Sequence, residues 1–182
     1  MQRSIWYKPP SVTDMARNTK LTKQEVKFLY RSFKQECPTG IIDQDAFVAI
    51  YGKIFPLGDP TKYAQFIFQS IYHEHENRMT FGDFMDFLSL VSKGSLEVKI
   101  AWSFNFYDIN NDGFIDLTEM QSVAEAIFDL MGSSAAQHKR VHQIEKIFLA
   151  MDANRDGLVS FQEFQHYCNE NPSIRDAMIH FP

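Results

Sequence analysis

A fourfold repeat constrains the fold of this chain more than any other feature. At four places a glycine or asparagine is followed, two residues later, by an aliphatic residue or methionine: Gly40 with Ile42, Asn77 with Met79, Gly113 with Ile115, and Gly157 with Val159. The twelve-residue loops that contain these pairs begin at Gln35, Tyr72, Asp108 and Asp152, at intervals of 37, 36 and 44 residues. A repeat of this length indicates one supersecondary unit copied four times.

The segments that flank the loops have the periodicity of amphipathic helices. Before the first loop, apolar residues fall at i, i+3, i+4 and i+7, at Val26, Leu29, Tyr30 and Phe33. Thr22 and Glu25 have the spacing of a capping box at the start of this helix. Similar stripes flank the later loops, at Leu96, Ile100, Phe104 and Tyr107, at Met120, Val123, Ala124 and Ile127, at Val141, Ile144, Phe148 and Met151, and at Phe164, Tyr167 and Cys168, with Ser95 as a candidate N-cap.

These patterns predict an all-α fold of four helix-loop-helix units in two pairs, with a short β ribbon between the paired loops. We expect an N-terminal arm over residues 1–20, a first pair over residues 21–92, and a second pair with a C-terminal helix over residues 93–182. The polar stretch 132–140 is the expected link between the last two units. Ile115 and Val159, at position 8 of their loops, should pair in the second ribbon.

The third and fourth loops have an oxygen ligand at every position that an EF-hand uses to bind calcium. Ca²⁺ is a hard cation that takes six to eight oxygens, from loop positions 1, 3, 5, 7 (a backbone carbonyl), 9 and 12. The expected ligands are Asp108, Asn110, Asp112, Phe114, Asp116 and Glu119 in the third loop, and Asp152, Asn154, Asp156, Leu158, Ser160 and Glu163 in the fourth. Carboxylates this close together repel one another strongly unless a cation lies among them. The sequence therefore predicts two Ca²⁺ sites, with Mg²⁺ as a competitor at the third loop, where Asp116 adds a fourth carboxylate.

The first loop keeps the fold of the unit and lacks the ligands. Gln35, Cys37 and Ala46 stand at positions 1, 3 and 12, where anionic or amide oxygens are required, and Pro38 imposes another loop geometry. We expect no metal there.

The second loop is also degenerate, with Tyr72 at position 1 and the short Asp83 at position 12. Weak binding through Glu74, Glu76 and Asp83 stays open as an alternative, and His73 with His75 leaves zinc as a lesser one.

Composition disfavours several other classes of function. Residues 1–35 have eight Lys and Arg against two acidic residues, so the remainder of this chain of net charge -5 stands at -11, which disfavours nucleic acid as a partner. Two cysteines are too few for a disulfide framework, which favours a cytoplasmic location.

No stretch approaches the roughly 20 apolar residues of a membrane span, and Gln2 replaces the glycine that N-myristoylation needs, so we expect no direct lipid anchor. No nucleophile-base arrangement or phosphate-binding glycine loop is present, and we expect no enzymatic activity.

The chain resembles the neuronal calcium sensor superfamily from about Leu21 to Pro182. The resemblance is carried by residues 33–40 (Phe-Lys-Gln-Glu-Cys-Pro-Thr-Gly), 54–63, 93–96 and 102–110 (Trp-Ser-Phe-Asn-Phe-Tyr-Asp-Ile-Asn), and a first loop with Cys-Pro is a mark of that superfamily. Within it the chain is most similar to the voltage-gated potassium channel-interacting proteins, in residues 29–38 and 104–110 and in the Asp that ends the disabled second loop. The short N-terminal arm and Tyr72 depart from that branch.

The resemblance implies a calcium-sensing regulator with a long hydrophobic groove, which in the channel-interacting branch holds the N-terminal helix of A-type potassium channels. We therefore expect a cytoplasmic protein that binds an amphipathic or apolar helix of a target and reaches the membrane through it. Regulation of a receptor kinase or guanylate cyclase is the alternative, and 17 Phe argue against a simple calcium buffer. The candidate groove residues are Phe47, Ile50, Tyr51, Phe55, Phe66, Phe84, Phe87 and Leu88. An open groove of this kind also favours self-association.

Overall fold

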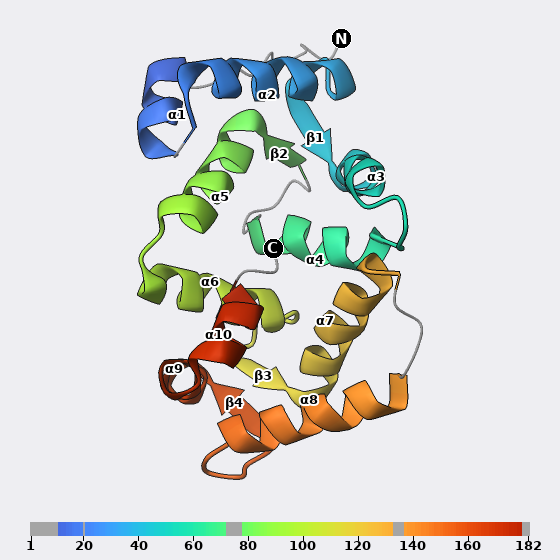
Figure 1. The fold of residues 1–182 in the computed structure, drawn as a ribbon, viewed down its shortest axis with the longest axis vertical. Helices are drawn as coiled ribbons and strands as arrows, with labels where there is room; N and C mark the ends of the chain where they lie inside the picture. Colours follow the sequence, from blue (N-terminus) through green and yellow to red (C-terminus); the bar gives the residue numbers. More distant parts are fainter. Residues whose placement is uncertain (1–10, 20, 72–77, 133–136, 180–182) are drawn as a thin grey trace.

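The computed structural model describes residues 11–19, 21–71, 78–132 and 137–179 of the chain, which are mostly helical (Figure 1). The helices are α1 (Val12–Asn18), α2 (Lys23–Glu36), α3 (Gln44–Ile54), α4 (Thr61–Ile71), α5 (Phe81–Lys93), α6 (Leu96–Tyr107), α7 (Leu117–Leu130), α8 (Gln137–Met151), α9 (Phe161–Glu170) and α10 (Pro172–Ile179). None of the described helices is long and apolar enough to span a bilayer.

Two antiparallel ribbons join the units in pairs. β1 (Ile41–Asp43) pairs with β2 (Arg78–Thr80), and β3 (Phe114–Asp116) pairs with β4 (Leu158–Ser160). In the second ribbon Ile115 lies opposite Val159, and both side chains are buried. The predicted fold class, two EF-hand pairs each with a β ribbon, is confirmed.

A capping box fixes the start of three of the four helices that follow a ribbon strand, α5, α7 and α9, whereas α3 has only the N-cap Asp43. At α7 the carboxylate of Asp116 accepts a hydrogen bond from the N–H of Glu119, and Glu119 accepts one from the N–H of Asp116. Ser160 with Glu163 repeats this arrangement at α9. The last residue of each loop is also the third residue of the following helix. A displacement of that residue therefore moves the helix with it.

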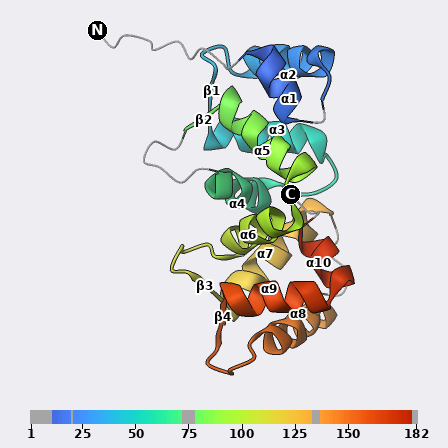
Figure 2. The ribbon, with the colours of Figure 1, turned by 90° about the vertical axis from the view of Figure 1, so that its left-hand side faces the viewer.

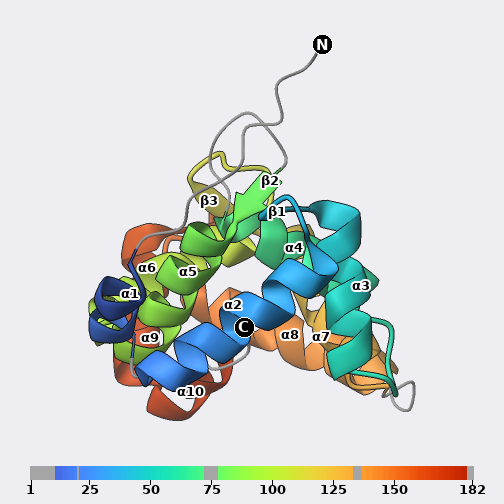
Figure 3. The ribbon, with the colours of Figure 1, turned by 90° about the horizontal axis from the view of Figure 1, so that it is seen from above.

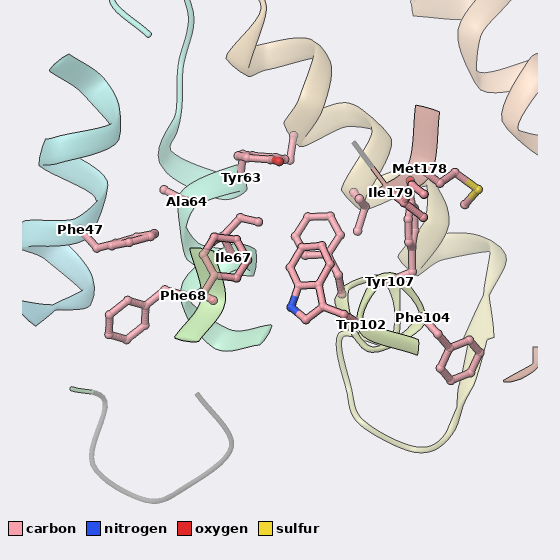
Figure 4. Close-up of a cluster of buried hydrophobic side chains, with 14 of the residues drawn as sticks. Phe47, Tyr63, Ala64, Ile67, Phe68, Trp102, Phe104, Tyr107, Met178 and Ile179 are labelled. Carbon is pink, nitrogen blue, oxygen red and sulfur yellow. The ribbon is translucent and has the colours of Figure 1, made fainter. Parts of the chain in front are cut away.

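The two pairs stack along the long axis of the molecule, with α4 of the first pair against α6 and α7 of the second (Figures 1 and 2). Aromatic rings fill this interface (Figure 4). Tyr63 meets Phe106 edge-on with ring centroids 5.8 Å apart, and Trp102 stacks on Phe106 at 5.5 Å. The high aromatic content therefore supplies part of the core that joins the two pairs.

Two segments differ from the sequence-based expectation. The expected arm over residues 1–20 contains helix α1, whose Met15 is buried against α2 and α5. The expected link over 132–140 is shorter, because α8 already begins at Gln137. Polar residues favour loops only weakly, and a contact with a neighbouring helix overrides that preference.

Candidate metal centres and apolar groove

The turn of the third loop is fixed by hydrogen bonds to its own ligand side chains. The carboxylate of Asp108, only 5% exposed, accepts hydrogen bonds from the N–H groups of Asp112 at 3.1 Å and Gly113 at 2.9 Å. Gly113 has a φ of +88°, the left-handed conformation that the sharp turn requires. Asn111 before it has a φ of +57°, which asparagine tolerates better than most residues.

Glu119 lies at the inner end of this loop and is buried. Its carboxylate accepts from the N–H of Asn110 at 3.1 Å and from the N–H of Asp116 at 2.9 Å. Burial raises the pKa of Glu119, against the lowering effect of these two backbone donors. A buried carboxylate whose charge is penalised is stabilised by a cation placed beside it.

The fourth loop repeats the geometry. Asp152 accepts from the N–H groups of Asp156 at 3.2 Å and Gly157 at 3.0 Å, and Gly157 has a φ of +85°. The pKa of Glu163 is lowered, mainly by hydrogen bonds from Ser160, because this carboxylate is more exposed than Glu119. The two loops therefore share one backbone path and differ in how strongly burial penalises the charge at position 12.

The donor set fits a hard divalent cation. Both loops offer carboxylate and amide oxygens, and the fourth adds the hydroxyl of Ser160, with no sulfur or imidazole in either ligand set, which suits Ca²⁺ or Mg²⁺. Over the described part of the chain, no three His, Cys, Asp or Glu side chains already meet as a metal-holding group. The position-12 carboxylates accept backbone hydrogen bonds instead, so Glu119 and Glu163 would exchange N–H donors for the ion as it binds.

The first loop is held by contacts of another kind. The ammonium group of Lys34 donates to the carbonyl of Pro38, and the N–H of Gly40 donates to the carbonyl of Cys37 at 2.9 Å. Cys37 itself is buried. A fixed positive charge at the loop disfavours a second cation there.

In the second loop, residues 72–77 lie outside the described residues, and with them the weak-binding and zinc alternatives at Glu74, Glu76, His73 and His75. Asp83 at position 12 is described, and its carboxylate forms a capping box with Thr80 at the start of α5.

An apolar groove of about 650 Å³ runs through the first pair between α2, α3 and α5. Seven of the eight predicted residues line it: Phe47, Ile50, Tyr51, Phe55, Phe84, Phe87 and Leu88. The eighth, Phe66, lies instead on α4 beside a small hollow of about 10 Å³ next to Asp108. Sequence reasoning missed the wall contributed by α2 and the ribbon, which consists of Phe28, Leu29, Ser32, Phe33, Glu36, Ile42 and Met79.

The floor of this first-pair groove is buried and its rim is exposed. Phe47 is 2% exposed, whereas Phe28 on the α2 rim is 68% exposed. Burial among the aromatic rings raises the pKa of Tyr51 to about 12. The groove is therefore a preformed hollow with apolar anchors at its edge, the usual form of a site for an amphipathic helix.

The second pair has its own apolar face covered by the chain. Helix α10 packs against α6 and α9, with Met178 and Ile179 buried. The hydroxyl of Ser103 on α6 donates to the carbonyl of Met178 at 3.4 Å.

Comparison with known proteins agrees with this geometry. A family model described as an EF-hand domain pair matches residues 97–169, which contain the third and fourth loops. Neuronal calcium sensor 1 of Lymnaea stagnalis is 32% identical over 181 residues, covering 97% of this chain and 95% of the relative. The protein of the same name from Aplysia californica is 33% identical with the same coverage. The chain belongs to the neuronal calcium sensor family. It is thus a regulatory protein of the EF-hand, calcium-sensing type, which confirms the predicted superfamily.

Proposed function

We propose that this protein binds two Ca²⁺ ions, at the third and fourth loops, and holds a helical segment of a target protein in the first-pair groove. The favoured target is the apolar N-terminal segment of an A-type voltage-gated potassium channel, because residues 29–38 and 104–110 resemble the channel-interacting branch. The proposal also keeps the division of the chain into an N-terminal arm (residues 1–20), a first pair (21–92) and a second pair with a C-terminal helix (93–182).

The observation that carries the proposal is the first-pair groove itself. Its residues come from α2, α3 and α5, and neither loop of that pair has a complete ligand set. Since Ca²⁺ opens a groove only through loops that hold it, this groove exists without the ion. Its volume of about 650 Å³ accepts several large side chains along one face of a helix.

Calcium would then tune the groove from the second pair. Glu119 is the third residue of α7, and at the other end of α7 the carbonyl of Asp129 accepts from the N–H of Asp59 at 2.8 Å. Asp59 follows Phe55, a groove residue, in the loop between α3 and α4. A shift of α7 on ion binding would therefore be passed to one wall of the groove.

Calorimetric titration of a channel N-terminal peptide tests the proposal. We expect binding both with Ca²⁺ and with a chelator, with different affinities in the two conditions. Phe28→Asp should weaken binding about tenfold or more, because a charge on an aromatic anchor costs on the order of 1–2 kcal/mol. Leu149→Asp on α8 is the matched control, because Leu149 is also 68% exposed but lies outside the groove, and it should bind as the unsubstituted protein does.

Absence of binding in both conditions, together with tight binding of a receptor kinase or guanylate cyclase segment that Phe28→Asp abolishes, would overturn the channel target and keep the groove. Equal losses in Phe28→Asp and Leu149→Asp would overturn the groove.

A further inference from the structure

A second hollow lies between the two EF-hand pairs and is distinct from the first-pair groove. This interpair cleft has a volume of about 520 Å³ and lies between the end of α4, the helix α5 and the exposed side of α6. Its lining residues are Ser70, Ile71, Asp83, Asp86, Phe87, Leu90, Val98, Ala101, Trp102 and Asn105. Among the residues that the structure describes, Phe87 alone borders both hollows.

One of the residues that line the cleft, Trp102, has a buried hydrogen-bond donor without an acceptor. The indole Nε1 of Trp102 has no hydrogen-bond partner among the described residues, although the side chain is only 8% exposed. In Figure 4 this nitrogen lies on the edge of the ring that points away from Phe104 and Tyr107. A buried N–H without a partner costs free energy, so a carbonyl or another acceptor that reached this nitrogen would be favoured.

The cleft is also acidic at one edge. Asp83 and Asp86 line it, and neither carboxylate belongs to an ion pair within the described ranges. Burial, and then the neighbouring charge of Asp83, raise the pKa of Asp86. A cationic side chain at this edge would offset both penalties. The chemistry of the cleft therefore fits a segment with aromatic side chains, a positive charge and free carbonyl groups.

The N-terminal residues of this chain have that composition. Arg3 and Lys8 flank the aromatic pair Trp6 and Tyr7, and Pro9 and Pro10 follow. A proline has no N–H to donate and retains a carbonyl that accepts.

The described chain to which these residues are joined, at the N-cap Ser11 of α1, packs on one wall of the cleft, helix α5. Helix α1 lies against α5 (Figure 3) and is held there by Lys93, whose ammonium group donates to the carbonyl of Arg17 at 2.7 Å. Asp86 borders both the interpair cleft and the small hollow under α1 that Asp14 lines. Ten extended residues span up to about 33 Å, roughly three times the length of the seven-residue helix α1.

We propose that residues 3–10 of this chain dock into the interpair cleft of the same molecule. Trp6 and Tyr7 pack on its apolar walls, Arg3 or Lys8 pairs with Asp86, and a backbone carbonyl accepts from Nε1 of Trp102. Docking would clamp the two pairs together, because the cleft has walls from both. The inference is independent of the proposed target and of calcium.

The chain has two tryptophans, one in the segment and one in the cleft, so indole signals report both sides. In the ¹⁵N-labelled chain of 182 residues, with the two indole peaks assigned from Trp6→Phe, we expect the Trp102 N–H to exchange slowly with water. In the Trp102→Phe variant, Trp6 is the remaining tryptophan. We expect acrylamide to quench its fluorescence several-fold less than it quenches that of a free peptide of residues 1–11. Asp86→Lys and the double variant Arg3→Glu with Lys8→Glu should each speed exchange at Trp102 and expose Trp6. Asp45→Lys is the matched control, because Asp45 is exposed on α3 and lies outside the cleft, and it should change neither signal.

Two results together would overturn the proposal: quenching of Trp6 fluorescence equal to that of the free peptide, and an exchange rate at the Trp102 indole that neither charge variant changes. Protection that appears only as the protein concentration rises would place the segment on a second copy and would also overturn docking within one molecule.

Discussion

Gly58→Ala should weaken the contact between the two pairs and so test that contact separately from the rest of the fold. Gly58 lies in the loop between α3 and α4, where a Cβ atom would stand 2.0 Å from the carbonyl oxygen of Leu130 and 2.5 Å from that of Asp129. Both are backbone atoms at the end of α7, so no side-chain rotation relieves the clash. The loop must withdraw from α7, which breaks the 2.8 Å hydrogen bond from Asp59 to Asp129.

The expected loss of stability follows from these contacts. Overpacking costs about 1–3 kcal/mol, and the lost hydrogen bond adds about 1 kcal/mol. Replacing glycine gives back about 0.4–1 kcal/mol through the unfolded chain. The net effect is a loss of about 1–3 kcal/mol, or a Tm lower by roughly 2–12 °C for a chain of this size.

Urea unfolding at fixed Ca²⁺ concentration, followed by circular dichroism, measures this change. Gly52→Ala is the matched control, because Gly52 lies within α3 and its added Cβ would be 3.8 Å from Pro60 Cγ, an ordinary contact. It should stabilise the protein by about 0.5–1 kcal/mol. Equal effects of the two substitutions, within about 0.5 kcal/mol, would refute the argument that α7 and this loop are in direct backbone contact.

Two further predictions concern the thiols and a helix cap. Burial raises the pKa of Cys168 from 9.0 to about 11 and also raises that of Cys37, so both should react slowly with Ellman's reagent at pH 8 and quickly in urea. The stability that the neutral Cys168 thiol provides is present below pH 9 and lost as the pH rises to about 11, and urea midpoints across this range should show a smaller decline in Cys168→Ala. Thr22→Ala removes the capping box of α2 and should cost about 1 kcal/mol in the same urea assay, whereas Thr118→Ala, at an exposed position in α7, should cost much less.

The loops and ribbons could be predicted because the sequence motif specifies their geometry directly. Gly113 and Gly157 stand where φ must be positive, and the residues two positions later meet across the second ribbon. The last ligand position also fixes the start of the next helix, as the capping box of Glu119 shows. These features depend on local spacing, which a sequence contains in full.

The groove and the cleft depend on how helices pack, and spacing alone does not determine that. Phe66 and Phe28 are both aromatic residues on amphipathic helices, yet Phe66 faces α6 while Phe28 lines the groove. Phe28 lies one residue before Leu29 of the predicted stripe, and Ser32 follows it one turn later. Phe28 and Ser32 thus form a second row beside the predicted stripe, and this row could have indicated the α2 wall of the groove. Helix α1 has only seven residues, and its buried Met15 shows that packing on α5 holds it in place.

Calcium calorimetry on the chelator-treated protein tests the central claim most directly. We expect two ions per chain, with dissociation constants in the range of roughly 10⁻⁷–10⁻⁵ M that is usual for sensors. Glu119→Gln and Glu163→Gln should each leave one ion, because each removes the bidentate carboxylate of one loop, while Asp83→Asn in the degenerate second loop should leave two. Three or more tight sites in the unsubstituted protein, or two ions still bound after either glutamate is replaced, would contradict the assignment.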